Sequence, residues 1–117
     1  MKVHGQCHCG ELVYEAEVDP ALASICHCTD CQILTGTAYR VSVPARAENF
    51  RILNGEPKIY VKTAESGNPR AQAFCPTCGT PIYASDVKHP QLFNLRTGPL
   101  AERAELKPQR QIWCRSA

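Results

Sequence analysis

The stretch Cys26-His27-Cys28-Thr29-Asp30-Cys31 places three thiols within six residues. Two further clusters, Cys7-His8-Cys9 and Cys75-Pro76-Thr77-Cys78, repeat the pattern, so that seven of the eight cysteines are grouped. Thiolates two or three positions apart can converge on one ion, because a reversed turn aims both sulfurs inward at the ~2.3 Å that zinc requires. The spacing predicts metal ligation by two zinc ions, and a fold that depends on them.

Seven ligands divide into a closed site of four and an open site of three. Cys7 and Cys9 precede a predicted strand, while Cys75 and Cys78 lie on a turn, like the two halves of a zinc ribbon brought together by sheet formation. The remaining ligands are Cys26, Cys28 and Cys31. An open coordination position is where metal chemistry occurs, so the division indicates catalysis.

The second site could also be closed by a fourth ligand. Cys114, His27 or the backbone could supply a fourth ligand, which would make both metals structural. His8 and His27 lie between cysteines, where strand alternation would point their rings away from the metal. Cys114 is expected to be a semi-buried thiol beside Trp113.

Disulfide and redox chemistry are the other interpretations of so many cysteines. Residues 1–10 are polar and lack a basic stretch followed by an apolar run, so they do not resemble a signal peptide. We therefore expect a cytoplasmic protein with reduced thiols, and a Cys-x-Cys pair is in any case poor disulfide geometry. Gly79 and Pro81 disfavour the helix that a thioredoxin-like motif would start.

Length and charge bound the remaining possibilities. A chain of 117 residues predicts one domain, here residues 1–117. The net charge of +2 is too small for a nucleic-acid footprint, and no apolar stretch approaches the ~20 residues of a membrane span. We expect neither nucleic acid nor membrane as a partner, and no pattern sets an oligomeric state.

Short alternating segments predict a mainly-β fold of short antiparallel strands. In residues 11–18, Leu12, Tyr14, Ala16 and Val18 share one face, with Val13 as the one apolar exception opposite. Thr29 or Asp30 would cap a helical turn ending at Gly36. The other expected features are strands at 23–26, 37–43 (ended by Pro44), 71–74, 81–84 and 92–96, a hairpin of 50–53 with 58–62 around Asn54-Gly55, and a loop at 66–69.

Three segments together resemble the glutathione-dependent formaldehyde-activating enzyme family, also called the CENP-V/GFA domain. They are Gly5-Gln6-Cys7-His8-Cys9-Gly10, Cys26-His27-Cys28-Thr29-Asp30-Cys31 followed by Thr35-Gly36, and Phe74-Cys75-Pro76-Thr77-Cys78-Gly79-Thr80-Pro81. The intervening Phe50-Arg51-Ile52-Leu53-Asn54-Gly55-Glu56-Pro57 is also similar to the family's strand and turn. The resemblance covers most of the chain.

This resemblance implies a β-tent zinc-binding fold. It implies that Cys7, Cys9, Cys75 and Cys78 hold a structural zinc, and that Cys26, Cys28 and Cys31 hold a catalytic one. The implied activity is that of a carbon-sulfur lyase, which combines a small thiol such as glutathione with a small aldehyde such as formaldehyde to give S-(hydroxymethyl)glutathione. The thiol would occupy the fourth zinc position, lose its proton and add to the carbonyl carbon.

The chain departs from the family pattern near its end, which bears on substrate recognition. Relatives often have Pro-x-x-His-Ile-Trp where this chain has Pro108-Gln109-Arg110-Gln111-Ile112-Trp113, and Gln111 cannot act as an acid or base. Arg40, Arg46, Arg51 and Arg70 are candidates to neutralise substrate carboxylates, with none favoured. The alternative functions are a β-tent structural or protein-binding module with both zincs structural and, less compatible with such scattered ligands, metal buffering.

Overall fold

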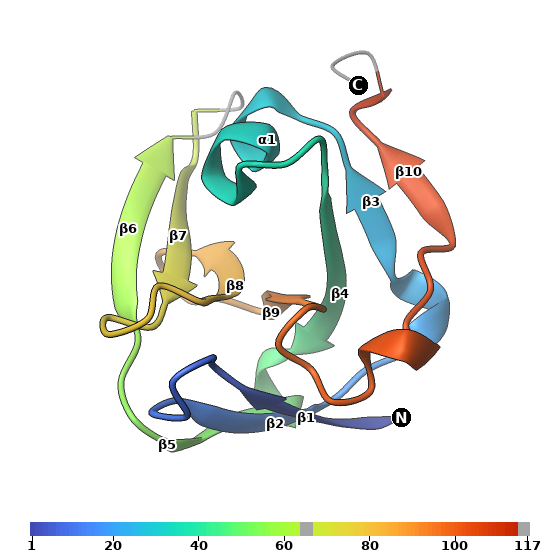
Figure 1. The fold of residues 1–117 in the computed structure, drawn as a ribbon. Coiled ribbons are helices and arrows are strands. Elements are labelled where there is room, and N and C mark those ends of the chain that lie inside the picture. Colours follow the sequence, from blue (N-terminus) through green and yellow to red (C-terminus); the bar gives the residue numbers. More distant parts are fainter. Residues whose placement is uncertain (64–66, 115–117) are drawn as a thin grey trace.

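Over the described residues, 1–63 and 67–114, this computed structural model contains ten strands and one α-helix (Figure 1). The strands are β1 (Lys2–Gln6), β2 (Val13–Glu17), β3 (Ser24–Cys26), β4 (Arg40–Arg46), β5 (Phe50–Asn54), β6 (Lys58–Thr63), β7 (Pro69–Phe74), β8 (Pro81–Asp86), β9 (Leu92–Arg96) and β10 (Arg110–Ile112). The helix is α1 (Thr29–Thr35), and the 3-10 turns are η1 (Pro20–Leu22), η2 (Ala47–Asn49) and η3 (Arg103–Glu105).

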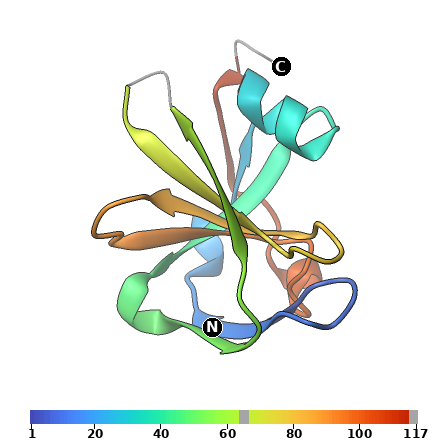
Figure 2. The same ribbon diagram turned by 90° about the vertical axis from the view of Figure 1, so that its left-hand side faces the viewer.

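The strands form a small sheet of order β1-β2-β5 and a large sheet of order β10-β3-β4-β9-β8-β7-β6. Figure 1 shows β6 and β7 on one side and β3, β4 and β10 on the other, with α1 between them at one end. In Figure 2, β8 and β9 run behind β6 and β7. The pairs are antiparallel except β10 with β3. The mainly-β prediction is confirmed, and within the described residues no helix is long and apolar enough to cross a membrane.

The small sheet buries one face against the large sheet. The predicted inward residues Leu12, Tyr14, Ala16 and Val18 are all buried, at 6% exposure or less, and Val13 opposite them is half-buried. This confirms the alternation in residues 11–18, because successive side chains of a strand point to opposite faces.

Aromatic rings join the two sheets. The ring centroid of Phe50 on β5 lies 6.0 Å from that of Tyr14 and 5.5 Å from that of Tyr83 on β8, both edge to face. It lies 4.9 Å from the ring centroid of Phe93 on β9. Such pairs contribute about 0.5–1.5 kcal/mol each beyond the area they bury. The cluster therefore fixes the small sheet over the middle of the large one.

The predicted hairpin of residues 50–53 and 58–62 is wrong, although both strands exist. β5 pairs with β2 and β6 pairs with β7, so the two strands belong to different sheets. Asn54 Nδ2 donates a 2.8 Å hydrogen bond to the carbonyl of Glu11, and a Cβ on Gly55 would lie 2.6 Å from the same oxygen. The Asn-Gly pair packs on the small sheet and redirects the chain, instead of closing a two-residue turn.

Pro44 does not end its strand as predicted, since β4 runs from Arg40 to Arg46. β3 pairs only with residues 40–42 of β4, so beyond Ser42 one edge of β4 has no neighbouring strand. A proline there need not remove a ladder hydrogen bond, because the missing N–H can face the open edge.

The remaining local predictions are largely confirmed. Strands occupy the regions predicted at 23–26, 71–74, 81–84 and 92–96, and Gly36 ends α1 in the left-handed conformation with φ 67°. Ser66 of the predicted loop lies outside the described residues, and Pro69 already belongs to β7. Sequence reasoning missed β1 and β10, which lie near the two ends of the chain.

Gly5 on β1 gives the first testable prediction. An added Cβ would lie 2.1 Å from the ring of Tyr14, its buried cross-strand partner. We expect Gly5→Ala to lower the free energy of unfolding by about 1–3 kcal/mol, because the ring must move within a packed core. The measurement is urea denaturation of the metal-loaded protein. Gly98→Ala is the control, since nothing lies within 4 Å of its added Cβ, and equal losses in the two variants would contradict the packing argument.

Candidate functional site

Two similar turns bring the four-thiol cluster together. One turn follows β1 in the small sheet and the other follows β7 in the large sheet, so the cluster lies between the two sheets. In the first turn Gly10 N–H donates to the Cys7 carbonyl at 3.0 Å, and in the second Gly79 N–H donates to the Cys75 carbonyl at 2.9 Å. Gly10 and Gly79 have φ of 83° and 80°, which L side chains rarely adopt. Each turn thereby aims its thiols inward.

The sulfur positions in this cluster fit a tetrahedral zinc. Four sulfurs at ~2.3 Å from zinc lie about 3.8 Å apart. The Cys7 and Cys9 sulfurs are 3.6 Å apart, Cys9 and Cys75 are 3.7 Å apart, and all four, with Cys78, lie within 4.8 Å of one another. The Leu12 N–H also donates to Cys7 Sγ at 3.2 Å, which favours the thiolate that a metal needs. These four residues could hold a metal ion.

Cys26, Cys28 and Cys31 form the second cluster, where β3 runs into α1. Their sulfurs lie within 4.8 Å of one another and all three residues are half-buried. Cys28, not Thr29 or Asp30 as predicted, is the N-cap, and its Sγ accepts a 3.2 Å hydrogen bond from Cys31 N–H. A sulfur replaces the usual oxygen cap because Cys28 is the last extended residue. Among the described residues no fourth His, Cys, Asp or Glu joins this group.

The three thiols of the second cluster do not ionise alike. Burial acts to raise the pKa of Cys28, but hydrogen bonds from Cys31 and Cys26 and the positive charge of Lys62 lower it overall. Burial, followed by the neighbouring thiols, raises the pKa of Cys31 to about 12, and burial raises the pKa of Cys26. One negative charge opposes the next because the three sulfurs are crowded, and a bound cation would remove that conflict.

Both histidines between cysteines lie outside the two clusters, as alternation predicts. The His27 ring instead lies toward β10, where its Nε2 is 2.7 Å from Oε1 of Gln111. The Tyr39 ring also lies near His27, with ring centroids 5.8 Å apart and the ring planes tilted by 58°. Gln111, which departs from the family pattern, therefore reaches the site region through His27. His8 is exposed.

Cys114 differs from its prediction. It is exposed, not semi-buried, and it belongs to neither thiol cluster. β10 pairs in parallel with β3 only as far as Cys26, and Trp113 then takes a φ of 58°, so that the chain turns after Ile112. Cys114 is therefore not the fourth ligand of the second cluster in this conformation.

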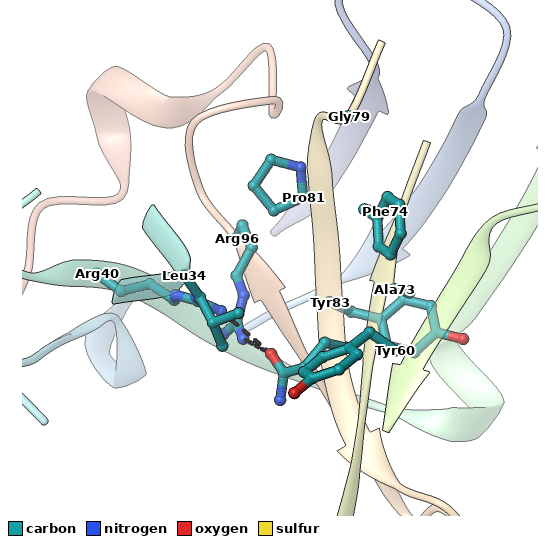
Figure 3. A pocket seen from close by; sticks show the side chains of 10 residues that line it. Leu34, Arg40, Tyr60, Ala73, Phe74, Gly79, Pro81, Tyr83 and Arg96 are labelled. Carbon is teal, nitrogen blue, oxygen red and sulfur yellow. Dashed lines mark hydrogen bonds between the residues drawn. The ribbon is translucent and has the colours of Figure 1, made fainter. Parts of the chain in front are cut away.

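A cavity of about 380 Å³, shown in Figure 3, is lined by residues that neighbour the second cluster. Leu34, one turn after Cys31, and Arg40, the cross-strand partner of Cys26, form its near side. The exposed Tyr60, on β6, also lines the cavity. The other lining residues are Gln72, Ala73, Phe74, Gly79, Pro81, Tyr83 and Arg96. The cysteines themselves line neither this cavity nor a wider one of about 670 Å³ that shares Arg40, Pro81 and Arg96.

Two buried arginines lie in the cavity wall, and Figure 3 shows the side chains of Arg40 and Arg96 pointing toward each other. Arg40 Nη1 and Arg96 Nη2 donate to the same amide oxygen, Gln72 Oε1, at 3.3 Å and 3.1 Å. Arg96 Nη1 also donates to Ser42 Oγ at 2.7 Å. Burial, followed by repulsion from Arg40, lowers the pKa of Arg96 to about 9, which leaves it charged at neutral pH.

Strand register explains why the arginines share a face with the second cluster. Cys26 is paired with Arg40, and Ser42, two residues further along β4, is paired with Arg96. Directly paired residues, and residues two apart on one strand, project from the same face. Sequence reasoning named Arg40 among four candidates and missed Arg96. For Arg40 the available signal was the alternation in 40–43, which places Arg40 and Ser42 on one face and Val41 and Val43 on the other; no local signal marked Arg96.

Comparison with solved structures supports the fold. A crystal structure of a Rhodobacter sphaeroides protein superposes with a TM-score of 0.70 at 23% sequence identity, covering 95% of this chain and 99% of that one. At this identity the similarity establishes the fold alone. No curated protein matches the chain.

Family comparison is consistent with the two thiol clusters. The family described as glutathione-dependent formaldehyde-activating enzyme matches residues 2–116, nearly the whole chain. All three cysteine clusters lie within that match. The chain therefore belongs to the glutathione-dependent formaldehyde-activating enzyme family.

Proposed function

We propose that the protein is a zinc-dependent carbon-sulfur lyase that adds a small thiol, such as glutathione, reversibly to a small aldehyde, such as formaldehyde. The observation that carries this proposal is the contrast between the clusters. Four thiols surround one candidate metal position, whereas the second cluster has only three ligands among the described residues, and its neighbours Leu34 and Arg40 line a cavity. Membership of the family supports the reaction class. Because all eight cysteines are free, a reducing compartment such as the cytoplasm suits the protein.

The proposed reaction replaces one sulfur bond by another. The S–H bond of the thiol and the π bond of the aldehyde break, an S–C bond forms, and the proton ends on the former carbonyl oxygen. A zinc ion held by Cys26, Cys28 and Cys31 would supply an open coordination position in which the incoming thiol is a thiolate. The cavity would hold the rest of the substrate near that position, so that proximity is the protein's main contribution.

Charge near the second cluster suits an incoming thiolate. Lys62 Nζ forms a 2.7 Å ion pair with Asp30, which links β6 to the first turn of α1. The positive charge of Lys62 lowers the pKa of Cys28, and that of Arg40 acts in the same direction on Cys31. These positive groups would offset part of the negative charge that three thiolates leave on a divalent metal.

The four-thiol cluster has a structural role in this proposal. Cys75 is fully buried, and because one turn of this cluster belongs to the small sheet and the other to the large sheet, a metal held by both would link the two sheets. A structural zinc contributes ~10–16 kcal/mol of apparent binding free energy, as much as the ~5–15 kcal/mol by which a domain is stable.

Removal of metal tests that role. We expect a chelator that strips both metals to unfold the protein at 25 °C, because the binding free energy of a structural zinc equals or exceeds the stability of the domain. Circular dichroism and the melting temperature, recorded alongside metal content, provide the measurement. An unchanged spectrum and an unchanged Tm in metal-free protein would exclude a structural role for metal.

Metal content and metal environment test the catalytic site. We expect about two zinc ions per chain by mass spectrometry. Addition of glutathione should add one sulfur ligand to one of the two zinc ions in each chain, because only one site is open. X-ray absorption should show this as a rise in the mean number of sulfurs per zinc. One zinc per chain, or two four-sulfur shells that glutathione does not alter, would favour the structural-module alternative.

A matched pair of variants separates the two clusters. Serine is a good helix N-cap, so Cys28→Ser should keep α1 capped while removing a thiolate. We expect it to reduce thiol addition at least about 100-fold with little change in Tm. Cys75→Ser should instead lower stability by several kcal/mol. Thermal unfolding and formation of the hydroxymethyl thioether, followed by NMR, measure both effects. Equal activity of Cys28→Ser and the native protein would refute the assignment.

A further inference from the structure

Arg40 and Arg96 are buried cations with no negative partner in the described part of the protein. Their exposed fractions are 6% and 9%, and among residues 1–63 and 67–114 no carboxylate forms an ion pair with either guanidinium. The nearby Arg70 already pairs with Asp86 at 2.8 Å. Buried charges are ordinarily paired, because transfer of an unpaired ion from water is unfavourable.

The hydrogen bonds of the two arginines are also incomplete. The Nε atoms of both are buried and have no acceptor among the described residues. Their terminal nitrogens share one neutral oxygen on Gln72, and within the described part of the chain Arg96 alone has a second partner, Ser42. The low pKa of Arg96 has the same origin in burial and in repulsion from Arg40. An acceptor carrying negative charge would satisfy these donors.

The second thiol cluster offsets only half of this charge. A divalent metal with three thiolates carries one negative charge, against two positive charges on the arginines. One positive charge therefore remains on this face of the large sheet. Its size matches a carboxylate, which is a monoanion at neutral pH, better than a phosphate, which carries about −1.5 to −2.

Geometry places that charge where a substrate could reach it. Cys26, Arg40 and Arg96 project from the same face of the sheet, and both arginines line the 380 Å³ cavity. Leu34 and Tyr60, both exposed, form an apolar rim (Figure 3). A molecule with its sulfur at the cluster could extend across this rim and set an anionic group against the guanidiniums.

We propose that Arg40 and Arg96, oriented by Gln72, form a carboxylate-binding subsite that selects thiol substrates carrying a carboxylate several bonds from the sulfur. The assignment of this subsite to a thiol rests on the proposed function. The carboxylate accepts from the guanidinium forks, and Gln72 keeps both guanidiniums in the cavity wall. A neutral thiol of the same length lacks this contact and binds more weakly.

Propionate, which has no thiol, tests the subsite in the zinc-loaded protein. NMR of the arginine Nε–H groups should show saturable shifts of the two buried signals with propionate, and none with its neutral analogue propionamide. Arg96→Gln and Arg40→Gln should each weaken propionate binding about ten- to a hundredfold, the range for loss of a charge-assisted hydrogen bond. The control is Arg46→Gln, since Arg46 lies on the same strand as Arg40 but is 74% exposed, and it should leave binding unchanged.

Several outcomes would overturn the subsite. They are equal shifts with propionate and propionamide, no shift at all, equal affinity in the native protein and both glutamine variants, or tighter binding of inorganic phosphate than of propionate. The comparison of propionate with propionamide needs only the native protein, so a variant that fails to fold does not remove the test.

Matched thiols separate this inference from the proposed function. Zinc X-ray absorption with 3-mercaptopropionate and with 3-mercaptopropanol reports coordination of each thiol to the metal. Coordination of both with equal affinity refutes the subsite and leaves the lyase proposal standing. Tighter coordination of 3-mercaptopropionate than of 3-mercaptopropanol, with the difference lost in Arg96→Gln, supports both the subsite and the lyase proposal. Propionate binding without coordination of any thiol, glutathione included, refutes the lyase proposal and the selection of thiols with it.

Discussion

Convergence of four thiols from two distant turns is the constraint on which the rest of the structure depends. Cys7 and Cys9 follow β1 in the small sheet, and Cys75 and Cys78 follow β7 in the large one. A zinc ion shared between them would fix the sheets relative to each other more strongly than any single packing contact. The turn that carries Cys75 and Cys78 leads directly into β8, whose first residue, Pro81, lines the cavity. The structural cluster would therefore also position the candidate site.

Local chemistry explains why much of the fold could be predicted from the sequence. Cysteine spacing within each turn, alternation in residues 11–18 and the glycine that ends α1 all depend on neighbours a few positions away. Pairing between distant strands has no such local signal. The error at β5 and β6 arose because Asn54-Gly55 favours a hairpin locally, whereas packing on Glu11 directs the two strands into different sheets.

In the candidate site, too, features with a local sequence signal could be predicted and those that depend on strand pairing could not. Both thiol clusters could be predicted, since each ligand type is distinctive and its spacing is short. The role of Arg96 could not be predicted, because arginine is common on exposed strands and only the pairing of β4 with β9 brings Arg96 beside Ser42. Gln111 illustrates the intermediate case. Its departure from the family pattern was visible in the sequence, but its contact with His27 follows from the parallel pairing of β10 with β3.

The alternation that builds the core also creates the unusual electrostatics of the cavity. On β4, Val43 faces the core while Arg40 and Ser42 face the opposite side of the sheet. The strand therefore cannot bury Val43 in the core without placing Arg40 and Ser42 on the cavity side. Two guanidiniums held there without a carboxylate partner among residues 1–63 and 67–114 destabilise the empty protein. Stability alone would favour neutral side chains at both positions. Their presence beside an open thiol cluster is consistent with a charge that arrives with the substrate, as in binding sites whose polar groups are preorganised before the ligand enters.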